Sequence, residues 1–346
     1  MKNTMKTLLA LMAGVMTFSA CSNENVLTNE TPNPETKPIL SFKAATENNT
    51  ATRATIDGLD IKWQENDAIL MMDGTNSSKY NLATGAATTS GTFTVDGGST
   101  AVEGENIYAL YPYAEGSSQA VTQAEAEAAA GSYDYKVGDW KDDYYSSPDF
   151  MKESALNDIK SEMDLRGIST ENQAIILAYI TGEESGTPAP ALSGSSITNV
   201  TIPTEQIVAT GQTVDPKAVL MVAKADGDNL AFKNVCSYVK VTPTVACKKI
   251  EVRAMDADLA GTFTVAVSDA PTASNISDGK SVVTLKAADG DLAAGTYYIA
   301  VLPGAKSKGI EVRFYTSAET FNYNARSTSF TFVRNKVHSG GDNSGL

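Results

Sequence analysis

The chain has 346 residues, and its 27 Lys and Arg residues are outnumbered by 41 Asp and Glu residues, for a formal net charge of -14 at pH 7. A surface of this sign repels polyanions, so the composition disfavours nucleic acid as a partner. The length is enough for two ordinary domains, each with its own hydrophobic core, and we expect two.

The start of the chain has the pattern of a lipoprotein signal peptide. A positive beginning with two lysines is followed by an apolar run over residues 8–18, and two small residues stand directly before Cys21. The apolar run is too short to span a bilayer core of about 30 Å as a stable helix. We therefore predict that residues 1–20 are removed and that Cys21 carries acyl chains. Each CH2 group that these chains bury in the membrane would contribute about 0.8 kcal/mol to anchoring.

Residues 21–53 are expected to be a disordered tether that carries one isolated strand. The tether is rich in Asn, Thr, Glu and Pro and contains few apolar residues. Within it, residues 39–44 alternate in a way that would place Leu40, Phe42 and Ala44 on one face of a strand. Because an apolar strand between two flexible stretches needs a partner, we expect it to pack into the fold downstream.

The first domain is expected over residues 54–214 and begins as short strands between Gly, Asp, Asn and Ser turns. Residues 114–190 interrupt this pattern as a long insertion, because they contain two stretches with helical composition. The predicted strands are 68–72, 79–82, 91–95 and 106–111, and the predicted helices are 117–130 and 154–165.

The second domain is expected over residues 215–346, again as a series of short strands. The pentapeptide Gly-Thr-Phe-Thr-Val at 91–95 recurs at 261–265, and each copy is followed by a strand that stops at a proline. Repeated strand order favours two related β domains.

Two cysteines remain after the signal peptide, Cys236 and Cys247. They could form one disulfide across a hairpin interrupted at Pro243, in the oxidising space that a signal peptide implies. They could equally be small unpaired residues of the core.

The sequence lacks the minimum parts of most catalytic sites. The only histidine, His338, lies close to a Gly- and Ser-rich terminus, and no His pair, paired-cysteine motif, Walker loop or dinucleotide fingerprint is present. We expect no enzyme activity, no cofactor and no metal. A glycosidase needs only two carboxylates, and would show itself by a deep cleft holding a carboxyl group whose pKa is raised by burial.

An aromatic and acidic cluster lies inside the insertion. Such a mixture could stack on a sugar ring and accept its hydroxyl hydrogen bonds, or it could pack the insertion onto the sheet beneath. The aromatic members are Tyr133, Tyr135, Trp140, Tyr144 and Tyr145.

Together these residues resemble the fimbrillin-like family, the lipoprotein-derived fimbria subunits of anaerobic Gram-negative bacteria and their surface relatives. The resemblance extends over essentially the whole chain and depends on the order of its motifs. These are Cys21, the strand 39–44, the junction Thr52-Arg53-Ala54, Trp63 before the strand 68–72, Ile202-Pro203-Thr204-Glu205-Gln206, Asp215-Pro216, the strand 220–223 and Phe232-Lys233-Asn234-Val235.

The resemblance implies a mainly β fold of two transthyretin-like antiparallel β-sandwich domains in tandem, with a partly helical insertion in the first. It also implies assembly by donor-strand exchange after a trypsin-like, arginine-specific protease cuts between Arg53 and Ala54. The strand 39–44 matches the strand that is lost with the pro-segment. Its removal would uncover apolar side chains and unpaired backbone groups that a strand of another fimbrial subunit could cover.

The family resemblance places the protein at the outer membrane, lipid-anchored and surface-exposed, or in a fimbrium once assembled. An alternative is a non-polymerising surface lipoprotein that binds glycans or proteins of a host or bacterial surface, in which Arg53 is an ordinary linker residue. Residues 339–346 lack the alternating apolar side chains of a donated strand. Phe330, Phe332 and Val333 are therefore either the donor strand or the last strand of their own domain.

Overall fold

The structure, a computed structural model, describes residues 37–47, 59, 61–74, 76–121, 123–181, 195–317, 321–326 and 329–342. The predicted lipidation site Cys21 and the predicted cleavage site at Arg53 and Ala54 lie outside these residues. In the described part the chain is mainly β with a helical insertion, which confirms the expected fold class at that level. No helix in these ranges is long and apolar enough to cross a membrane.

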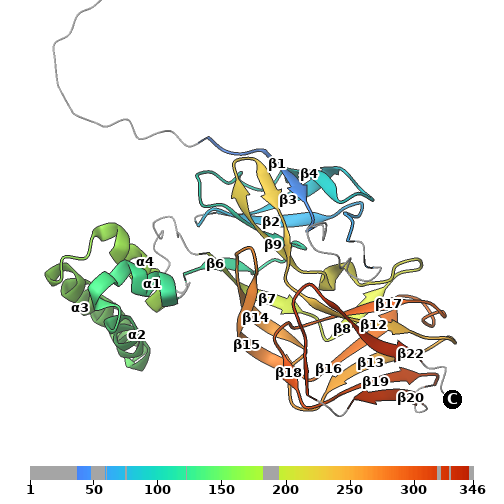
Figure 1. Cartoon of the computed structure of the whole chain (residues 1–346). Helices are drawn as coiled ribbons and strands as arrows, with labels where there is room; N and C mark the ends of the chain where they lie inside the picture. The colour runs from blue at the N-terminus through green and yellow to red at the C-terminus, as the bar shows by residue number, and fades with distance from the viewer. Residues whose placement is uncertain are drawn as a thin grey trace, which may run out of the picture. The chain divides into compact units, whose positions relative to one another are not determined.

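Seven strands of the described chain close into a barrel (Figure 1). They follow one another around the ring in the order β10, β1, β4, β3, β2, β5 and β9, and β9 pairs back to β10. Of these pairs within the described residues, β1–β10 alone is parallel. The bounds are β1 Ser41–Ala45, β2 Ala68–Met72, β3 Ser77–Thr84, β4 Ser90–Val95, β5 Tyr108–Tyr111, β9 Met221–Asp226 and β10 Asn229–Ala231, and the short β11, Lys233–Asn234, continues the pairing along β9.

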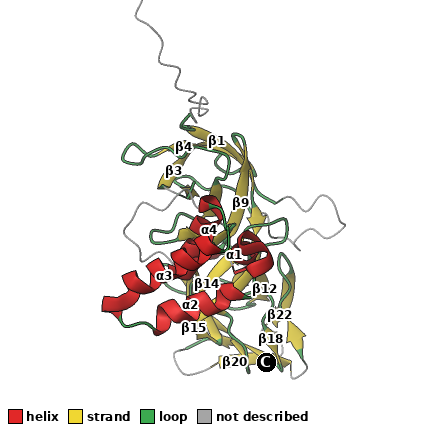
Figure 2. Cartoon of the chain, turned by 90° about the vertical axis from the view of Figure 1, so that its left-hand side faces the viewer, coloured by secondary structure: helices red, strands yellow, loops and turns green. Residues whose placement is uncertain are grey.

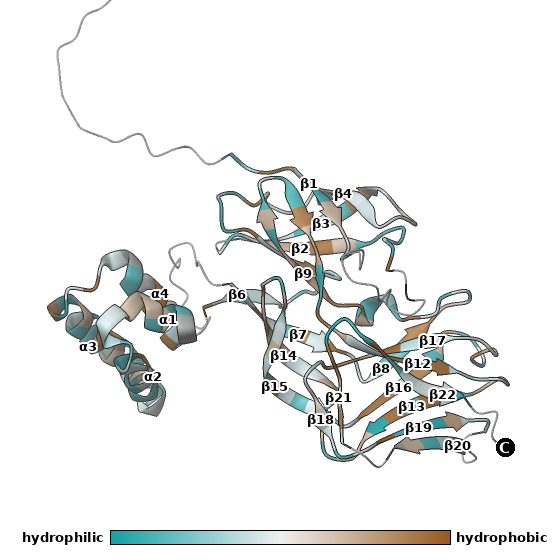
Figure 3. Ribbon diagram, in the orientation of Figure 1, coloured by the Kyte–Doolittle hydropathy of each residue, from teal (hydrophilic) through white to brown (hydrophobic). Residues whose placement is uncertain are grey.

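Buried apolar side chains of the strands and an aromatic cluster belong to the core of the barrel region. Figure 3 shows apolar residues along β2, where four consecutive side chains are buried. At the centre the Trp63 ring meets Phe93, Tyr111 and Phe232 edge to face, with ring centroids 5.0, 5.2 and 5.5 Å apart. Such contacts add to the burial of large rings, so this cluster anchors strands from distant parts of the sequence.

The other strands of the described chain form a five-stranded, a four-stranded and a three-stranded sheet and one short pair. The five-stranded sheet has β20 (Phe321–Arg326), β19 (Ile310–Tyr315), β13 (Lys249–Ala254), β16 (Val282–Ala287) and β8 (Glu205–Val208), in that order. The four-stranded sheet has β15 (Thr272–Lys280), β14 (Ala260–Ala266), β7 (Ser196–Ile202) and β6 (Ser118–Ala120). The three-stranded sheet has β17 (Tyr297–Val301), β12 (Ser237–Thr242) and β22 (Val337–Asp342), and β18 (Lys306–Ser307) pairs with β21 (Phe330–Thr331).

The first sheet differs from the two-sheet sandwich that the family resemblance implies. Because β1 and the β9–β10 hairpin fill the space between β4 and β5, the sheet has no free edges there and closes into a ring. The pairing also crosses the expected boundary at residue 215. Strands β9 and β10 lie after it but belong to the barrel, whereas β7 and β8 lie before it and pair with β14 and β16.

The α-helices of the described chain gather together (Figure 2). In the sequence they lie between β6 and β7, which pair antiparallel, so the insertion leaves and re-enters the sheet at one place (Figure 1). They bury a hydrophobic cluster of their own, separate from the main core. The prediction of a helix over 117–130 is wrong at its start, because residues 118–120 form β6, and two of the helices were not predicted. The bounds are α1 Gln123–Ala130, α2 Lys136–Ser146, α3 Lys152–Leu165 and α4 Thr170–Thr181, with 3-10 turns at Gly131–Tyr133, Asp149–Met151 and, outside the insertion, Pro216–Ala218.

Candidate functional site

The candidate site is the place in the barrel that residues 39–47 occupy, between β4 and β10, which we call the β1 slot. Strand β1 is antiparallel to β4, with Phe42 opposite Phe93, and parallel to β10, with Ala44 opposite Leu230. Neither neighbour is consecutive with β1 in the chain, so no hairpin joins it to either of them. The predicted strand 39–44 is thus present as Ser41–Ala45 and is packed into the fold downstream.

Two of the three predicted plug residues face the barrel interior. Phe42 is fully buried, with its ring centroid 5.5 Å from that of Tyr80, and Ala44 is buried as well. The prediction for Leu40 is wrong, because its side chain is 64% exposed. Leu40 precedes the first residue of the strand, where the alternation of faces no longer applies, and Ile39 packs against the core instead.

Both edges of β1 are hydrogen bonded through the backbone. Lys43 donates to the Asp228 carbonyl at 2.8 Å on one side, and Thr46 donates to the Thr89 carbonyl at 2.9 Å on the other. Without β1, backbone groups of β4 and of the β9–β10 hairpin would lose their partners, and each buried unpaired group costs about 1–3 kcal/mol. Outside the ladders, further backbone bonds of this segment run from Ile39 N to Val102 O, from Val95 N to Leu40 O and from Phe232 N to Ala45 O, at 2.9, 3.0 and 2.9 Å.

The N-terminal end of the slot is closed by a tyrosine. The Tyr80 hydroxyl donates to the Ile39 carbonyl at 2.6 Å and accepts from the Val102 N–H at 3.1 Å. Burial raises the pKa of Tyr80, and the hydrogen bond from the Val102 N–H lowers this pKa by a smaller amount. The hydroxyl therefore keeps its proton and its donor role at neutral pH.

At the C-terminal end, the strand is held by an ion pair. The Glu47 carboxylate accepts from the Asn234 N–H at 2.9 Å and from the Arg334 Nη1 and Nη2 groups at 3.0 and 3.4 Å. The two side chains are only 18% and 22% exposed, for Glu47 and Arg334 respectively. Sequence reasoning missed this contact, because the partners are 287 positions apart and neither belongs to a recognisable motif.

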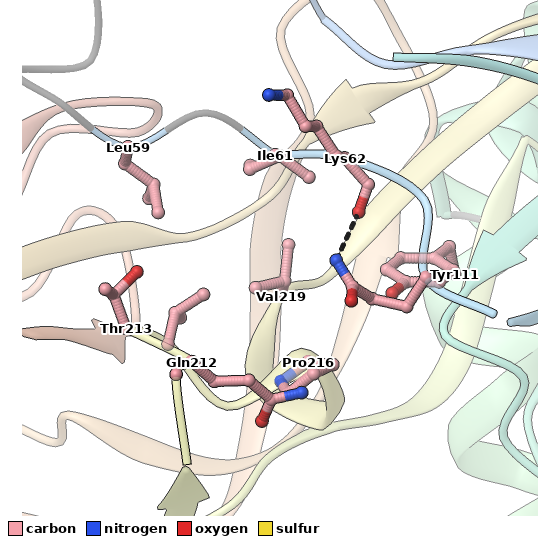
Figure 4. A pocket seen from close by; sticks show the side chains of 11 residues that line it. Leu59, Ile61, Lys62, Tyr111, Gln212, Thr213, Pro216 and Val219 are labelled. Atoms are coloured by element: carbon pink, nitrogen blue, oxygen red, sulfur yellow. Dashed lines mark hydrogen bonds between the residues drawn. The ribbon is translucent and has the colours of Figure 1, made fainter. Parts of the chain in front are cut away.

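A small cavity lies where the chain re-enters the described fold after residues 48–58 (Figure 4). Its volume is about 180 Å³, below the 300–1,000 Å³ that is typical of small-molecule sites. Tyr111 lines it and donates to Asp67 at 3.1 Å. Burial raises the pKa of Asp67, whose carboxyl group also accepts from the Gln64 N–H at 2.6 Å. No Asp or Glu is among the described residues that line this cavity, so these residues do not offer the pair of carboxylates that glycoside hydrolysis requires.

The aromatic residues of the insertion do not form one recognition face. Trp140 and Tyr144 are buried in the helical core and Tyr133 is half-buried, whereas Tyr135 and Tyr145 are exposed at the two ends of α2. No single face presents all five rings to a sugar, because the buried rings supply the core that the four short helices need. They pack within the insertion and not onto a sheet beneath it.

The two cysteines of the described chain are free thiols, so no disulfide joins Cys236 to Cys247. Both are buried as small residues of the main core. Burial raises the pKa of Cys236 to about 12, which keeps this thiol protonated and unreactive at neutral pH.

Phe330, Phe332 and Val333, the candidate donor residues, are part of their own fold. Phe330 pairs with Ser307 in the β18–β21 ladder, Phe332 is fully buried, and Val333 is half-exposed. The last described strand is β22, which runs parallel to β12 over the Gly-rich segment 337–342. Sequence reasoning gave this segment no strand, because a glycine that packs against Val239 and Val241 has no side chain to signal it.

No family model matches the chain, and no curated protein sequence matches it. Among solved structures, it is similar to a protein of Bacteroides uniformis assigned to cell adhesion, with 15% identity and a TM-score of 0.42 over 87% of this chain and 92% of that one. A second protein assigned to cell adhesion, from Bacteroides ovatus, is 12% identical with a TM-score of 0.42 over 88% and 91% of the two chains. A fimbrial protein of Bacteroides ovatus is 11% identical with a TM-score of 0.34, over 89% of this chain and 49% of that one. The likeness is distant in all three.

Proposed function

We propose that this protein is a cell-surface lipoprotein that serves as a structural or accessory subunit of a fimbrium, with a role in adhesion, and that it assembles by exchange of β1. The observation that supports this most is the β1 slot. A strand of five residues is buried on one face and paired on both edges, yet it is tied to its neighbours by non-covalent contacts alone. A strand held in this way can be replaced by another of similar chemistry.

The chain's own strand protects the slot before assembly. Because β1 is linked to the barrel through residues 48–58, it rebinds at a high effective concentration, and a partner strand cannot compete. Cleavage between Arg53 and Ala54 by an arginine-specific protease would end this advantage. The slot would then expose the pocket of Phe42 and the unpaired edges of β4 and β10, which favour addition of a strand from another subunit.

The same cut would separate the barrel from the predicted lipid on Cys21. Cleavage would thus release the subunit from its outer-membrane anchor and open its slot in one step. Nothing in this scheme requires catalysis by the protein itself, and we propose no enzyme activity for it.

The proposal is tested by treating the purified full chain with an arginine-specific protease. We expect a stable core that begins at Ala54 and forms ladders on gels run without heating. The matched control is Arg53→Ala, which should stay uncut at this position and monomeric. A core that begins elsewhere, or a core cut at Arg53 that stays monomeric at high protein concentration, would overturn the proposal.

A further inference from the structure

We infer that the β1 slot selects its incoming strand at three positions, an inference that rests on the proposed function. The third position requires a carboxylate, which Arg334 and the Asn234 N–H bind. The partner is an extended peptide segment with an aromatic residue, a small residue two positions later, and an acidic residue three positions after that. In this chain Phe42, Ala44 and Glu47 occupy these positions.

The first two positions follow from packing. Phe42 lies fully buried opposite Phe93 and beside Tyr80, in a space that a large ring fills. Ala44 lies opposite Gly91, and paired residues of antiparallel strands face the same side. A methyl group placed on Gly91 would come within 2.7 Å of Leu82 and 3.1 Å of Trp63, so this part of the interior is already full. A larger side chain at the Ala44 position would enter the same crowded space.

The third position is a preformed anion site. Arg334 donates not only to Glu47 but also to the Asn234 carbonyl at 2.7 Å, so its guanidinium has an anchor that stays when β1 leaves. The Asn234 N–H, 2.9 Å from the carboxylate, belongs to β11 and is positioned by the barrel. A strand without a carboxylate here would leave the largely buried Arg334 cation without a counter-charge and the Asn234 N–H without an acceptor, which is strongly unfavourable.

A second ion pair on the same strand does not belong to this selection. Lys43 and Asp228 are 2.9 Å apart, but their side chains are 70% and 50% exposed. Solvent screens such a pair, so it contributes little to binding. It therefore supplies a matched control for the carboxylate.

The candidate donor segment of this chain does not fit the three positions. If Phe330 took the place of Phe42, Phe332 would stand at the small position and Asn335 at the acidic one. The preferred occupant is therefore a strand of another protein that has the aromatic, small and acidic pattern, and not the Phe330 segment of a second copy.

The test uses the full chain with a site-specific protease sequence in place of residues 50–55, folded, cut and kept with its own strand bound. Fluorescent peptides of residues 38–47 are added in excess, and their entry into the slot is followed by fluorescence anisotropy. We expect Glu47→Gln and Ala44→Leu peptides to bind at least about tenfold more weakly than the native peptide, and Lys43→Gln to bind within about twofold. In an Arg334→Met chain the difference between the Glu and Gln peptides should disappear, and Arg334→Lys should restore part of it.

Each outcome decides between the two proposals. Equal binding of the Glu and Gln peptides to the unchanged chain overturns the carboxylate site, as does a preference that persists in a folded Arg334→Met chain. Because the peptide comparison on the unchanged chain needs no variant protein, it holds even if Arg334→Met does not fold. Failure of every peptide, the native one included, to enter the slot overturns the proposed function itself, and the inference with it.

Discussion

At the residue scale, Phe42 is the main side-chain contact between β1 and the barrel. Because it is fully buried, Phe42→Ala should lower the free energy of unfolding by about 3–5 kcal/mol, measured by urea denaturation. Leu40→Ala on the same segment is the control, and should change it by no more than about 0.5 kcal/mol, since that side chain is mostly exposed. Equal effects of the two substitutions would contradict the inward packing of β1.

A second prediction at the residue scale concerns Asp67 and the dependence of the free energy of unfolding on pH. Burial raises its pKa in the folded protein above the ordinary value of about 3.9, so the folded state disfavours the charged form. The stability linked to this group is complete below pH 3.9 and is lost as the pH rises through the raised value. Asp67→Asn does not titrate, so its stability relative to the native chain should increase across this window. A difference between the two proteins that is constant with pH would show that Asp67 is not responsible.

At the scale of elements, the helical insertion has its own core, so it should be able to unfold while the barrel stays folded. Trp140 is buried and donates to Glu162 at 2.8 Å, which joins α2 to α3. Trp140→Ala should therefore speed amide hydrogen exchange in residues 123–181 by about 100-fold, with little change in the barrel. Tyr135→Ala, at an exposed position of the same insertion, should leave exchange unchanged. Faster exchange throughout the chain would mean that the insertion supports the main core.

At the scale of the whole molecule, strands from each side of residue 215 complete the sheets of the other side, so the barrel and the other sheets depend on one another. The barrel needs β9 and β10 from beyond residue 215, and the sheets that follow need β7 and β8 from before it. We predict that fragments 1–214 and 215–346, expressed separately, show no cooperative thermal transition, while the full chain does. A sharp transition in either fragment would show that the expected domain boundary is a real one.

Local patterns in the sequence were enough to predict some features of this protein. Alternating apolar residues before and after turn residues predicted most strands, including the isolated one near the start, and a change of composition located the insertion. The burial of Phe42 and Ala44 followed from the same alternation. These features depend on residues within about ten positions of one another, and side-chain periodicity reports them directly.

Tertiary structure alone decided the closure of the barrel, the outward position of Leu40, the burial of Trp140 and the pairing of Glu47 with Arg334. Each depends on which distant segments come together, and the free-energy difference between alternative pairings is spread over many contacts. The sequence of a strand such as β1 does not indicate which two strands it pairs with, because any unpaired strand edge offers the same backbone groups. What the sequence determined by itself was therefore the strand, and the fold determined the slot that holds it.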